Sequence, residues 1–509
     1  MNRISLSKKT VIFMLVVIIF AALLLRIFNI GHVLAWDEAW NVHSIVDAAT
    51  GNTSDVFFKN FWRHPPLYLG CGILVEMLSG ASRFGLAYVM EFISLTFSII
   101  LLFLVFLCAK DWFGDIAALA SSFAFAVMPA ARIFDTWIKQ ESMTLVFCLL
   151  YLLFFFRKKY IVAGLCLGVA LLTKEICVFI PVGLFLFLII SRSFGKLKEF
   201  SEGIAVAVVI SAWWYLFFAS STGQFIDFFF GKHESAKVFW APWYLFWRRL
   251  PQDFGWIILV FAGIGLLSII WRLKARGIKR EGELEEVDYG LLMAIIFFVV
   301  YLVMTVSYGK PPWLAYSAFP FFAILAGFGF SLVLNALTCF RIHFVVVVLV
   351  LTLALSIIVG YNSFMMGADV TFSGGLVVKR ASEYVNKEIG EKGKIMLSAF
   401  DVSPVLFFYL KNYSPGGMVT LERNIEPESA MRIYSKYNIF LLDKGTTPIE
   451  AANLISVLRP SFLLVRYRPG YRGKNATYLA VSFASLIKPK KIGSIWLFDL
   501  RDYYGGDNR

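Results

Sequence analysis

Long apolar runs alternate with short polar connections over roughly the first 360 residues of the chain. A helix that crosses the hydrocarbon core of a bilayer needs about 20 apolar residues, and fewer where neighbouring helices bury its ends. Eleven runs fit this description, at residues 10–30, 84–108, 115–130, 142–156, 160–173, 175–191, 202–220, 253–271, 289–306, 313–337 and 342–361. The pattern therefore predicts a polytopic α-helical membrane protein with about eleven transmembrane helices. Residues 66–80 are also apolar, but the run is short and contains Glu76, so we expect an interfacial or re-entrant helix there.

The pattern changes after about residue 365. Short apolar segments at 394–400, 438–443 and 462–466 resemble strands, and they alternate with helical stretches near 376–390, 427–436 and 448–458. This alternation predicts a small C-terminal α/β domain over residues 365–509, after a membrane domain over residues 1–364. The C-terminal part contains no glycine-rich phosphate-binding motif, so nucleotide binding there has no support.

Composition and charge narrow the class of protein further. Hydrophobic residues make up 59% of the chain and charged residues 16%, whereas soluble domains carry about 25% charged residues. An aromatic content of 17% excludes a disordered chain. In membrane proteins, basic loops are typical of the cytoplasmic ends of helices, where they also contact anionic lipids. The net charge of +14 therefore does not indicate nucleic-acid binding. The six cysteines are scattered through apolar runs, and we expect neither disulfides nor cysteine-bound metal.

The distribution of basic residues predicts the orientation. Arg3, Lys8 and Lys9 precede the first run and no cleavage site follows it, so we expect an uncleaved helix with a cytoplasmic N-terminus. Tracing the spans alternately then places these basic residues on the cytoplasmic side: Arg157, Lys158, Lys159, Arg192, Lys196, Lys198, Arg272, Lys274, Arg276, Lys279, Arg280 and Arg341. The long loops 31–83 and 221–252 and the C-terminal domain fall outside. We therefore expect a multi-pass protein of the cell membrane with an extracytoplasmic C-terminal domain.

Two acids, Asp37 and Glu38, follow the first predicted span directly. An acid at the lip of an apolar bundle can have its pKa raised by desolvation or be held ionised by a cation, and either state suits proton transfer from a hydroxyl. A structural alternative is equally open, in which Asp37 caps a helix that runs from Glu38 to about Ala49. The two roles are compatible.

Further charged residues stand at the outer mouths of the predicted helices. Glu141 opens the fourth span, where the helix dipole alone would explain an acid. Lys174 and Glu175 interrupt an apolar run and are either turn punctuation or functional charges. The cations and histidines on the same side are Arg63, His64, Lys139, Lys232, His233 and Lys310. Singly, each is most simply a surface or snorkelling side chain, but together they fit a lipid-linked phosphate whose tail lies between the helices.

Five short segments in this order resemble the GT-C membrane glycosyltransferases. They are Trp36–Trp40, His64–Leu69, Lys139–Thr144, Gly164–Glu175 and Gly309–Pro320, all placed on one side of the membrane by the trace above. Within that group the chain is similar to the protein mannosyltransferase and aminoarabinose transferase branch. The resemblance covers about residues 10–330. It implies an enzyme that uses polyprenyl-phosphate sugars as donors and works on the outer side of the membrane.

The resemblance also implies roles for residues. Asp37 would take the proton from an acceptor hydroxyl on a protein, lipid or glycan while that oxygen attacks the anomeric carbon, with inversion of configuration. Glu38 and Glu141 would be the accompanying acids. Lys310 would stabilise the departing polyprenyl phosphate, with His233, Lys232, Arg63, His64 and Lys139 as further donor contacts. Some relatives bind a divalent cation, and His64, His233 and Asp37 could hold one here, but no spacing requires a metal.

Two other classes of function remain open from the residues alone. A transporter or flippase of lipid-linked glycans would place ionisable residues near the bilayer midplane and often shows repeated halves, whereas these charges gather at one face. A receptor-like protein would bind its ligand through the C-terminal domain and would not need Asp37.

Overall fold

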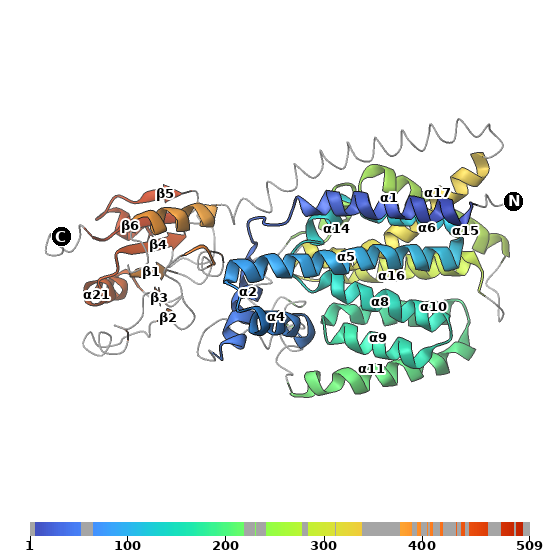
Figure 1. The fold of residues 1–509 in the computed structure, drawn as a ribbon, viewed down its shortest axis with the longest axis horizontal. Helices are drawn as coiled ribbons and strands as arrows, with labels where there is room; N and C mark the ends of the chain where they lie inside the picture. Colours follow the sequence, from blue (N-terminus) through green and yellow to red (C-terminus); the bar gives the residue numbers. More distant parts are fainter. Residues whose placement is uncertain are drawn as a thin grey trace. The chain divides into compact units, whose positions relative to one another are not determined.

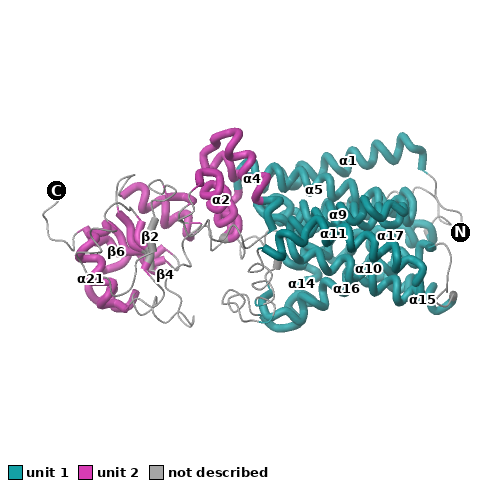
Figure 2. Tube along the Cα trace, turned by 90° about the horizontal axis from the view of Figure 1, so that it is seen from below, with its two compact units in different colours: residues 1–31, 62–68, 88–368 teal, residues 32–61, 69–87, 369–509 magenta. Residues whose placement is uncertain are grey.

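The structure is a computed structural model of the whole chain. It describes residues 6–51, 65–217, 241–276, 284–310, 312–337, 377–388, 394–398, 408–410, 418–420, 439–442, 447–466, 480–492 and 495–501, together with residues 227, 230, 405 and 434. The chain divides into two compact units, coloured separately in Figure 2.

The first unit is a helical bundle formed by residues 1–31, 62–68 and 88–368. Its long helices lie side by side (Figure 1). They are α1 (Lys8–Ile27), most of α5 (Arg83–Phe113), α6 (Asp115–Val127), α7 (Pro129–Phe134), α8 (Glu141–Phe156), α9 (Tyr160–Leu171), α10 (Phe179–Ile190), α11 (Leu197–Phe217), α14 (Leu245–Phe254), α15 (Trp256–Arg276), α16 (Glu286–Val306) and α17 (Phe319–Leu337). The short 3-10 helices η1 (Glu175–Val178), η2 (Phe194–Lys196) and η3 (Pro312–Ala318) connect them.

Within the described residues, six helices are long and apolar enough to cross a membrane. They are Lys8–Ile27, Arg83–Phe113, Phe194–Phe217, Trp256–Ala275, Glu286–Val306 and Trp313–Ala336. Four more predicted spans, at 115–130, 142–156, 160–173 and 175–191, coincide with shorter apolar helices. The eleventh, at 342–361, lies outside the described residues. The prediction of a polytopic helical membrane protein is confirmed, while the count of eleven stays a prediction.

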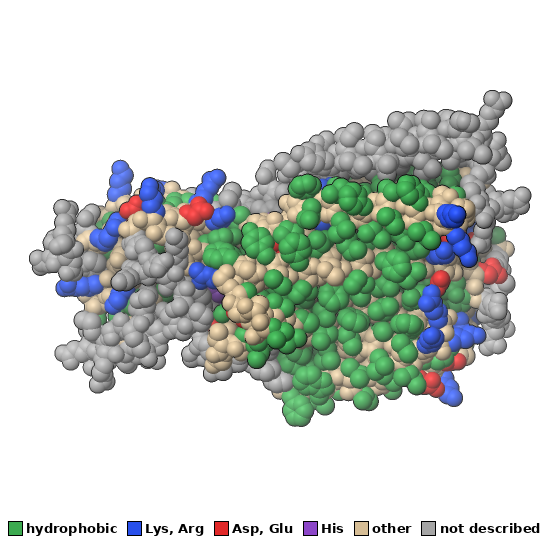
Figure 3. All heavy atoms as spheres, viewed as in Figure 1, with side chains coloured by type: hydrophobic (Ala, Val, Ile, Leu, Met, Phe, Trp, Pro, Cys, Tyr) green, Lys and Arg blue, Asp and Glu red, His purple; other side chains and the backbone are tan. Residues whose placement is uncertain are grey.

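The surface of this unit is apolar over most of its length. Figure 3 shows a broad hydrophobic surface across the helices, with lysine and arginine side chains at one end of it. Large apolar side chains such as Phe13, Phe20 and Phe103 are exposed along α1 and α5. Backbone hydrogen bonds are satisfied within each helix, so such a surface is suited to hydrocarbon as its solvent.

Close helix pairs in the bundle depend on glycine. A Cβ added at Gly164 of α9 would lie 2.5 Å from the carbonyl oxygen of Gly203 on α11. A Cβ added at Gly329 of α17 would collide with the carbonyl oxygen of Phe261 on α15. Small residues are favoured between membrane helices because they let the backbones approach. These positions therefore hold α9 against α11 and α15 against α17.

The second unit combines residues 32–61, 69–87 and 369–509. It contains α2 (Trp36–Ala49), most of α4 (Pro66–Ser79), helical residues 377–388 and α21 (Pro448–Leu458). Its sheet has six strands in the order β2-β3-β1-β4-β6-β5. The strands are β1 (Ile395–Ser398), β2 (Met418–Thr420), β3 (Ile439–Leu442), β4 (Phe462–Arg466), β5 (Lys490–Ile492) and β6 (Ile495–Asp499). Strands β2, β3, β1 and β4 run parallel to one another, and β6 runs antiparallel to both β4 and β5.

The predicted strands at 394–400, 438–443 and 462–466 correspond to β1, β3 and β4. Strands β2, β5 and β6 were not predicted. Two of them have only three residues, which is too short for an apolar alternation to stand out. Most of the predicted helix at 427–436 lies outside the described residues. The predicted helix near 66–80 is α4, and its side chains Leu74, Met77 and Leu78 are exposed.

Candidate active site

Asp37 lies in the first turn of α2, in the second unit. The helix begins at Trp36 with Ala35 as its N-cap, so the prediction that Asp37 caps a helix from Glu38 is wrong. The cap is supplied by Glu38, whose carboxylate accepts a hydrogen bond from the backbone N–H of Ala35 at 2.7 Å. A glutamate three residues after the N-cap is a recognised source of this bond. Asp37 is half-buried in the first turn of the helix.

Glu38 is fully engaged in holding this turn. Its side chain is inaccessible to solvent, and Nε2 of His32 lies 3.0 Å from both carboxylate oxygens. A buried carboxylate with two such partners is fixed in position. Of the two adjacent acids, Glu38 is therefore inaccessible to solvent, whereas Asp37 is half-buried.

In the first unit, Glu141 forms a buried ion pair. Glu141 is the first residue of α8 and Lys174 precedes η1, and the ammonium group of Lys174 donates to Oε1 of Glu141. The side chains are 3% and 11% exposed, so the attraction is poorly screened. Oε2 of Glu141 is buried and has no hydrogen-bond partner among the described residues. From the sequence, Lys174 was either a polar residue required by a turn or a functional charge. The structure shows that its partner is Glu141.

A second buried network lies next to Glu141. Nε of Arg26, near the end of α1, donates to Oδ2 of Asp135 at 2.5 Å. The hydroxyl of Tyr316 in η3 donates to the other oxygen of Asp135 and lies 3.3 Å from Oγ of Ser142. Arg26 also donates to backbone carbonyls of Ala22, Ala126 and Phe125. The network ties α1, the turn after α7, the start of α8 and η3 together.

Sequence reasoning missed Arg26 and Tyr316 as members of this region. The available signal was Arg26 itself, since a charge inside an apolar run is expensive and calls for a partner. Nothing in the sequence identified that partner, because Asp135 lies 109 residues further along the chain.

Two of the predicted phosphate-binding cations are buried in the first unit. Nζ of Lys139 lies 3.4 Å from the centre of the Trp313 ring and 4.9 Å from that of Trp137. Lys310 is 5% exposed, and its ammonium group donates to the carbonyl oxygen of Ser307. Burial lowers the pKa of Lys310 from its usual value, because desolvation disfavours the charged form. Both amines are therefore held in place before any substrate binds.

The other predicted contacts, Arg63, His64, Lys232 and His233, lie outside the described residues. The described acids fall in both units, with Asp37 and Glu38 in the second and Glu141 in the first. Among the residues that the structure describes, no group of three or more histidine, cysteine, aspartate or glutamate side chains is arranged to hold a metal ion.

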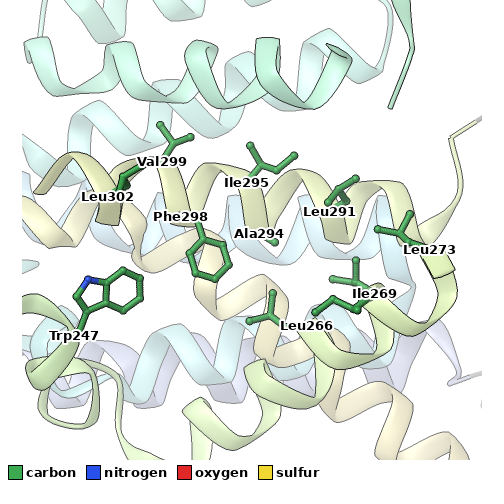
Figure 4. Close-up of a pocket in the computed structure, with 11 residues that line it drawn as sticks. Trp247, Leu266, Ile269, Leu273, Leu291, Ala294, Ile295, Phe298, Val299 and Leu302 are labelled. Atoms are coloured by element: carbon green, nitrogen blue, oxygen red, sulfur yellow. The ribbon is translucent and has the colours of Figure 1, made fainter. Parts of the chain in front are cut away.

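An apolar groove of about 410 Å³ lies between α15 and α16 (Figure 4). It is lined by Trp247 of α14 and by Leu266, Ile269, Ile270, Leu273, Leu291, Ala294, Ile295, Phe298, Val299 and Leu302. The indole N–H of Trp247 donates to the hydroxyl of Thr305, so its polar edge is satisfied. No lining side chain can exchange a proton, and the groove is suited to hydrocarbon rather than to sugar chemistry.

Comparison with known proteins links this arrangement to an enzyme fold. Residues 63–216 match the family model described as dolichyl-phosphate-mannose-protein mannosyltransferase. ArnT from Cupriavidus metallidurans, solved with bound undecaprenyl phosphate, aligns with a TM-score of 0.62 at 15% identity, covering 98% of this chain and 100% of that chain. AglB from Archaeoglobus fulgidus, solved with an inhibitory peptide and a dolichol-phosphate, has a TM-score of 0.57 at 13% identity, covering 98% of this chain and 75% of that chain.

The apo form of the A. fulgidus oligosaccharyltransferase aligns with a TM-score of 0.56 at 13% identity, covering 90% of this chain and 70% of that chain. No curated protein sequence matches the chain. The family model and the solved structures are membrane glycosyltransferases and give the transporter alternative no support. The resemblance predicted from the sequence is confirmed: the chain has the fold of the GT-C membrane glycosyltransferases.

Proposed function

We propose that this chain is an integral-membrane glycosyltransferase that moves a sugar from a polyprenyl-phosphate donor to the hydroxyl group of a protein, lipid or glycan. The observation that carries the proposal is the place of Asp37, half-buried in the first turn of α2, in a chain with the GT-C fold. The printed descriptions of the matching family and structures name dolichyl-phosphate mannose, undecaprenyl phosphate and dolichol-phosphate, which share the polyprenyl-phosphate chemistry.

Asp37 is the general base in this proposal. Its carboxylate accepts the proton of the acceptor hydroxyl while the oxygen forms a bond to the anomeric carbon of the sugar. The bond between that carbon and the phosphate oxygen breaks at the same time, and the polyprenyl phosphate leaves with the electron pair. Attack from the face opposite the phosphate inverts the configuration at the anomeric carbon.

Charge on the departing phosphate is balanced by fixed cations. Lys310 and Lys139 are proposed for this role because both amines are buried and already held by neighbours, so little reorganisation is needed. Arg63, His64, Lys232 and His233 are proposed as further donor contacts on the grounds of their position in the sequence. Such preorganised electrostatic stabilisation is usually a large part of the rate enhancement.

The other two acids support the base in different ways. Glu38 holds the first turn of α2 and thereby fixes Asp37. Glu141, whose Oε1 accepts a hydrogen bond from Lys174, is proposed as the accompanying acid because of its position in the sequence. The proposal includes no resident metal ion.

We propose that the N-terminus is cytoplasmic and that the C-terminal part and the reaction are outside. The support is the excess of lysine and arginine in the short loops assigned to the cytoplasmic side. Expression in a host that performs N-glycosylation tests this arrangement, because Asn475 belongs to an Asn-Ala-Thr sequon. Occupancy at Asn475 supports the orientation, and biotinylation of that segment by a cytoplasmic ligase contradicts it.

The activity is tested with purified protein in lipid vesicles and a panel of radiolabelled polyprenyl-phosphate sugars. Wild type is compared with Asp37→Asn, which removes the base at nearly constant shape. We expect wild type to transfer sugar from at least one donor and the variant to lose about 10²–10⁴-fold in kcat with donor binding retained.

Asp111→Asn is the matched control, because Asp111 pairs with Arg157 in a partly exposed ion pair at the far end of α5. It should keep wild-type turnover. Movement of labelled lipid across the bilayer without sugar transfer, unchanged in Asp37→Asn, would favour a flippase instead.

A further inference from the structure

A short segment of the C-terminal sequence packs on the helix that carries Asp37. Its described residues are Val405, Phe408, Tyr409 and Leu410, and they belong to the same compact unit as α2. Val405, Phe408 and Leu410 are buried, and Tyr409 is half-buried. Tyr409 contacts the entry to α2, and Phe408 contacts the middle of that helix.

Tyr409 reaches the entry to α2 directly. Its phenolic oxygen accepts a hydrogen bond from the backbone N–H of Leu34 at 3.3 Å. Leu34 immediately precedes the N-cap of α2 and lies three residues before Asp37. The first N–H groups of a helix and of the residues that lead into it have no partner within the helix, so a side chain that accepts from one of them fixes where the helix begins.

Tyr409 is in turn anchored to the C-terminal part of the chain. Its carbonyl oxygen accepts a hydrogen bond from Nδ2 of Asn386 at 2.8 Å, and Nζ of Lys379 lies 5.3 Å from the centre of its ring. Asn386 and Lys379 both belong to helical residues 377–388, just before β1. The start of α2 is therefore linked to the sheet-bearing part of the second unit through one tyrosine.

Phe408 makes the second contact. Its ring meets His43 of α2 edge to face with the centroids 6.4 Å apart, and both residues are nearly inaccessible to solvent. The opposite neighbour is Phe84 at the start of α5, with centroids 4.8 Å apart. Arg83 closes the arrangement by donating to the carbonyl oxygen of Leu410. Two points on α2, its entry and its second turn, are thus held by adjacent residues.

We infer that Tyr409 and Phe408 are positioning residues that orient α2 and thereby the carboxylate of Asp37. The C-terminal part of the chain thus fixes the direction in which the catalytic base points. The inference rests on the proposed function for the role of Asp37. It also implies that the start of α2 depends on Tyr409 for its local stability. This dependence can be measured without an assay of sugar transfer. General bases act only within hydrogen-bond reach of the proton, so a small displacement of α2 reduces the rate.

Tyr409→Phe tests the inference because it removes only the hydroxyl that Leu34 donates to. We expect kcat for sugar transfer to fall roughly fivefold to tenfold, the effect of one lost hydrogen bond at a position that orients the base. The KM for the donor should stay unchanged, because Lys139 and Lys310 belong to the other unit. Amide hydrogen exchange in a peptide covering residues 33–40 should become faster by a similar factor.

Tyr384→Phe is the matched control. Tyr384 also lies in helical residues 377–388, where its ring contacts Phe462 and the ammonium group of Lys490 rather than α2. It should leave kcat, KM and exchange at 33–40 as in wild type. Phe408→Leu should act in the same direction as Tyr409→Phe, and its exchange effect should extend to the second turn around His43.

The two proposals fail in different ways. If Asp37→Asn abolishes transfer but Tyr409→Phe keeps both wild-type kcat and wild-type exchange at 33–40, the positioning role is overturned and the glycosyltransferase stands. If no donor is used by wild type but exchange at 33–40 rises in Tyr409→Phe, the proposed activity fails while the dependence of α2 on Tyr409 is supported. An equal loss of kcat in Tyr384→Phe would mean general destabilisation, and it would overturn the positioning role.

Discussion

The first turns of α2 and α8 both contain acidic residues, and these acids differ in their surroundings. At α8 a single acid, Glu141, is buried and paired with Lys174. At α2 the two acids differ, because Glu38 is buried as the capping group and Asp37 is half-buried. The helix dipole favours an acid at each position equally. Burial in three dimensions, and not the place along the helix, separates Glu38 and Glu141 from Asp37.

Breaking the α8 pair should produce the largest change in stability. Lys174→Met leaves the carboxylate of Glu141 buried without its cation, and removing one partner of such a pair costs about 3–5 kcal/mol. Thermal unfolding in lipid or detergent can be followed with a thiol-reactive dye, because Cys108, Cys148 and Cys177 are buried in the folded protein. The double variant Lys174→Met/Glu141→Gln should recover most of the loss. An unfolding temperature of Lys174→Met equal to that of wild type would show that the pair does not hold Glu141.

A third acid near the end of a helix, Asp253 of α14, can be compared with these two through the pH dependence of stability. Burial raises the pKa of Asp253 to about 6, against the opposing effect of Arg249, whose guanidinium lies 3.1 Å away. A carboxyl group with a raised pKa in the folded state contributes stability that is full below the unfolded pKa of about 4 and is lost as the pH rises through 6.

We therefore expect Asp253→Asn to be more stable than wild type at pH 7.5 by up to about 3 kcal/mol, and to lose most of that advantage by pH 4.5. Thermal unfolding of both proteins across this range measures the difference. Asp111→Asn serves again as the exposed control and should show no comparable trend. A pH-independent difference between Asp253→Asn and wild type would contradict the expectation.

Because Glu38 and Asp37 differ in burial, replacing them should lower the stability of the protein by different amounts. Glu38→Ala removes the acceptor for the N–H of Ala35 and should destabilise the protein by about 0.5–2 kcal/mol. Glu38→Gln keeps an acceptor at the same place and should cost less. Asp37→Asn should cost less stability than Glu38→Ala, while kcat for transfer falls about 10²–10⁴-fold. Equal loss of stability in Asp37→Asn and Glu38→Ala would erase the distinction.

An effect on stability as small as that of Glu38→Ala is expected at Lys139. Its ammonium lies over the Trp313 ring, and loss of such a cation–π contact in Lys139→Met should cost about 0.5–2 kcal/mol. Lys139→Arg keeps the charge and the ring contact and should remain close to wild type in stability. A Lys139→Met protein that binds donor as tightly as wild type would remove Lys139 from the proposed phosphate contacts.

Much of the architecture followed from the sequence because its signals are local. The spans at 84–108, 289–306 and 313–337 are each apolar enough to be recognised alone, and α5, α16 and the η3–α17 stretch lie there. The parallel strands β1, β3 and β4 were also found, since each is a short buried apolar run. The three-residue strands β2 and β5 carry too little pattern to be seen, and only pairing with a neighbour defines them.

In the candidate site, too, local signals could be predicted from the sequence and long-range contacts could not. Asp37 and Glu141 were predicted as site residues because each follows or opens an apolar run, a property of neighbouring residues. The alternative that Asp37 is an N-cap was wrong by two residues, because the N-cap is Ala35 and Glu38 supplies the capping hydrogen bond. Arg26 and Tyr316 were missed because their shared partner, Asp135, is distant in sequence from both.

The sequence by itself determined that the chain spans a membrane, where most of its helices run, and which residues carry charge at their ends. Those properties depend on the solvation of consecutive side chains, which the order of residues specifies directly. Only the tertiary structure decided that Lys174 pairs with Glu141, that Glu38 rather than Asp37 is buried, and that Tyr409 holds the start of α2. Pairing and burial depend on contacts between residues far apart in the chain, and those contacts exist only once the chain has folded.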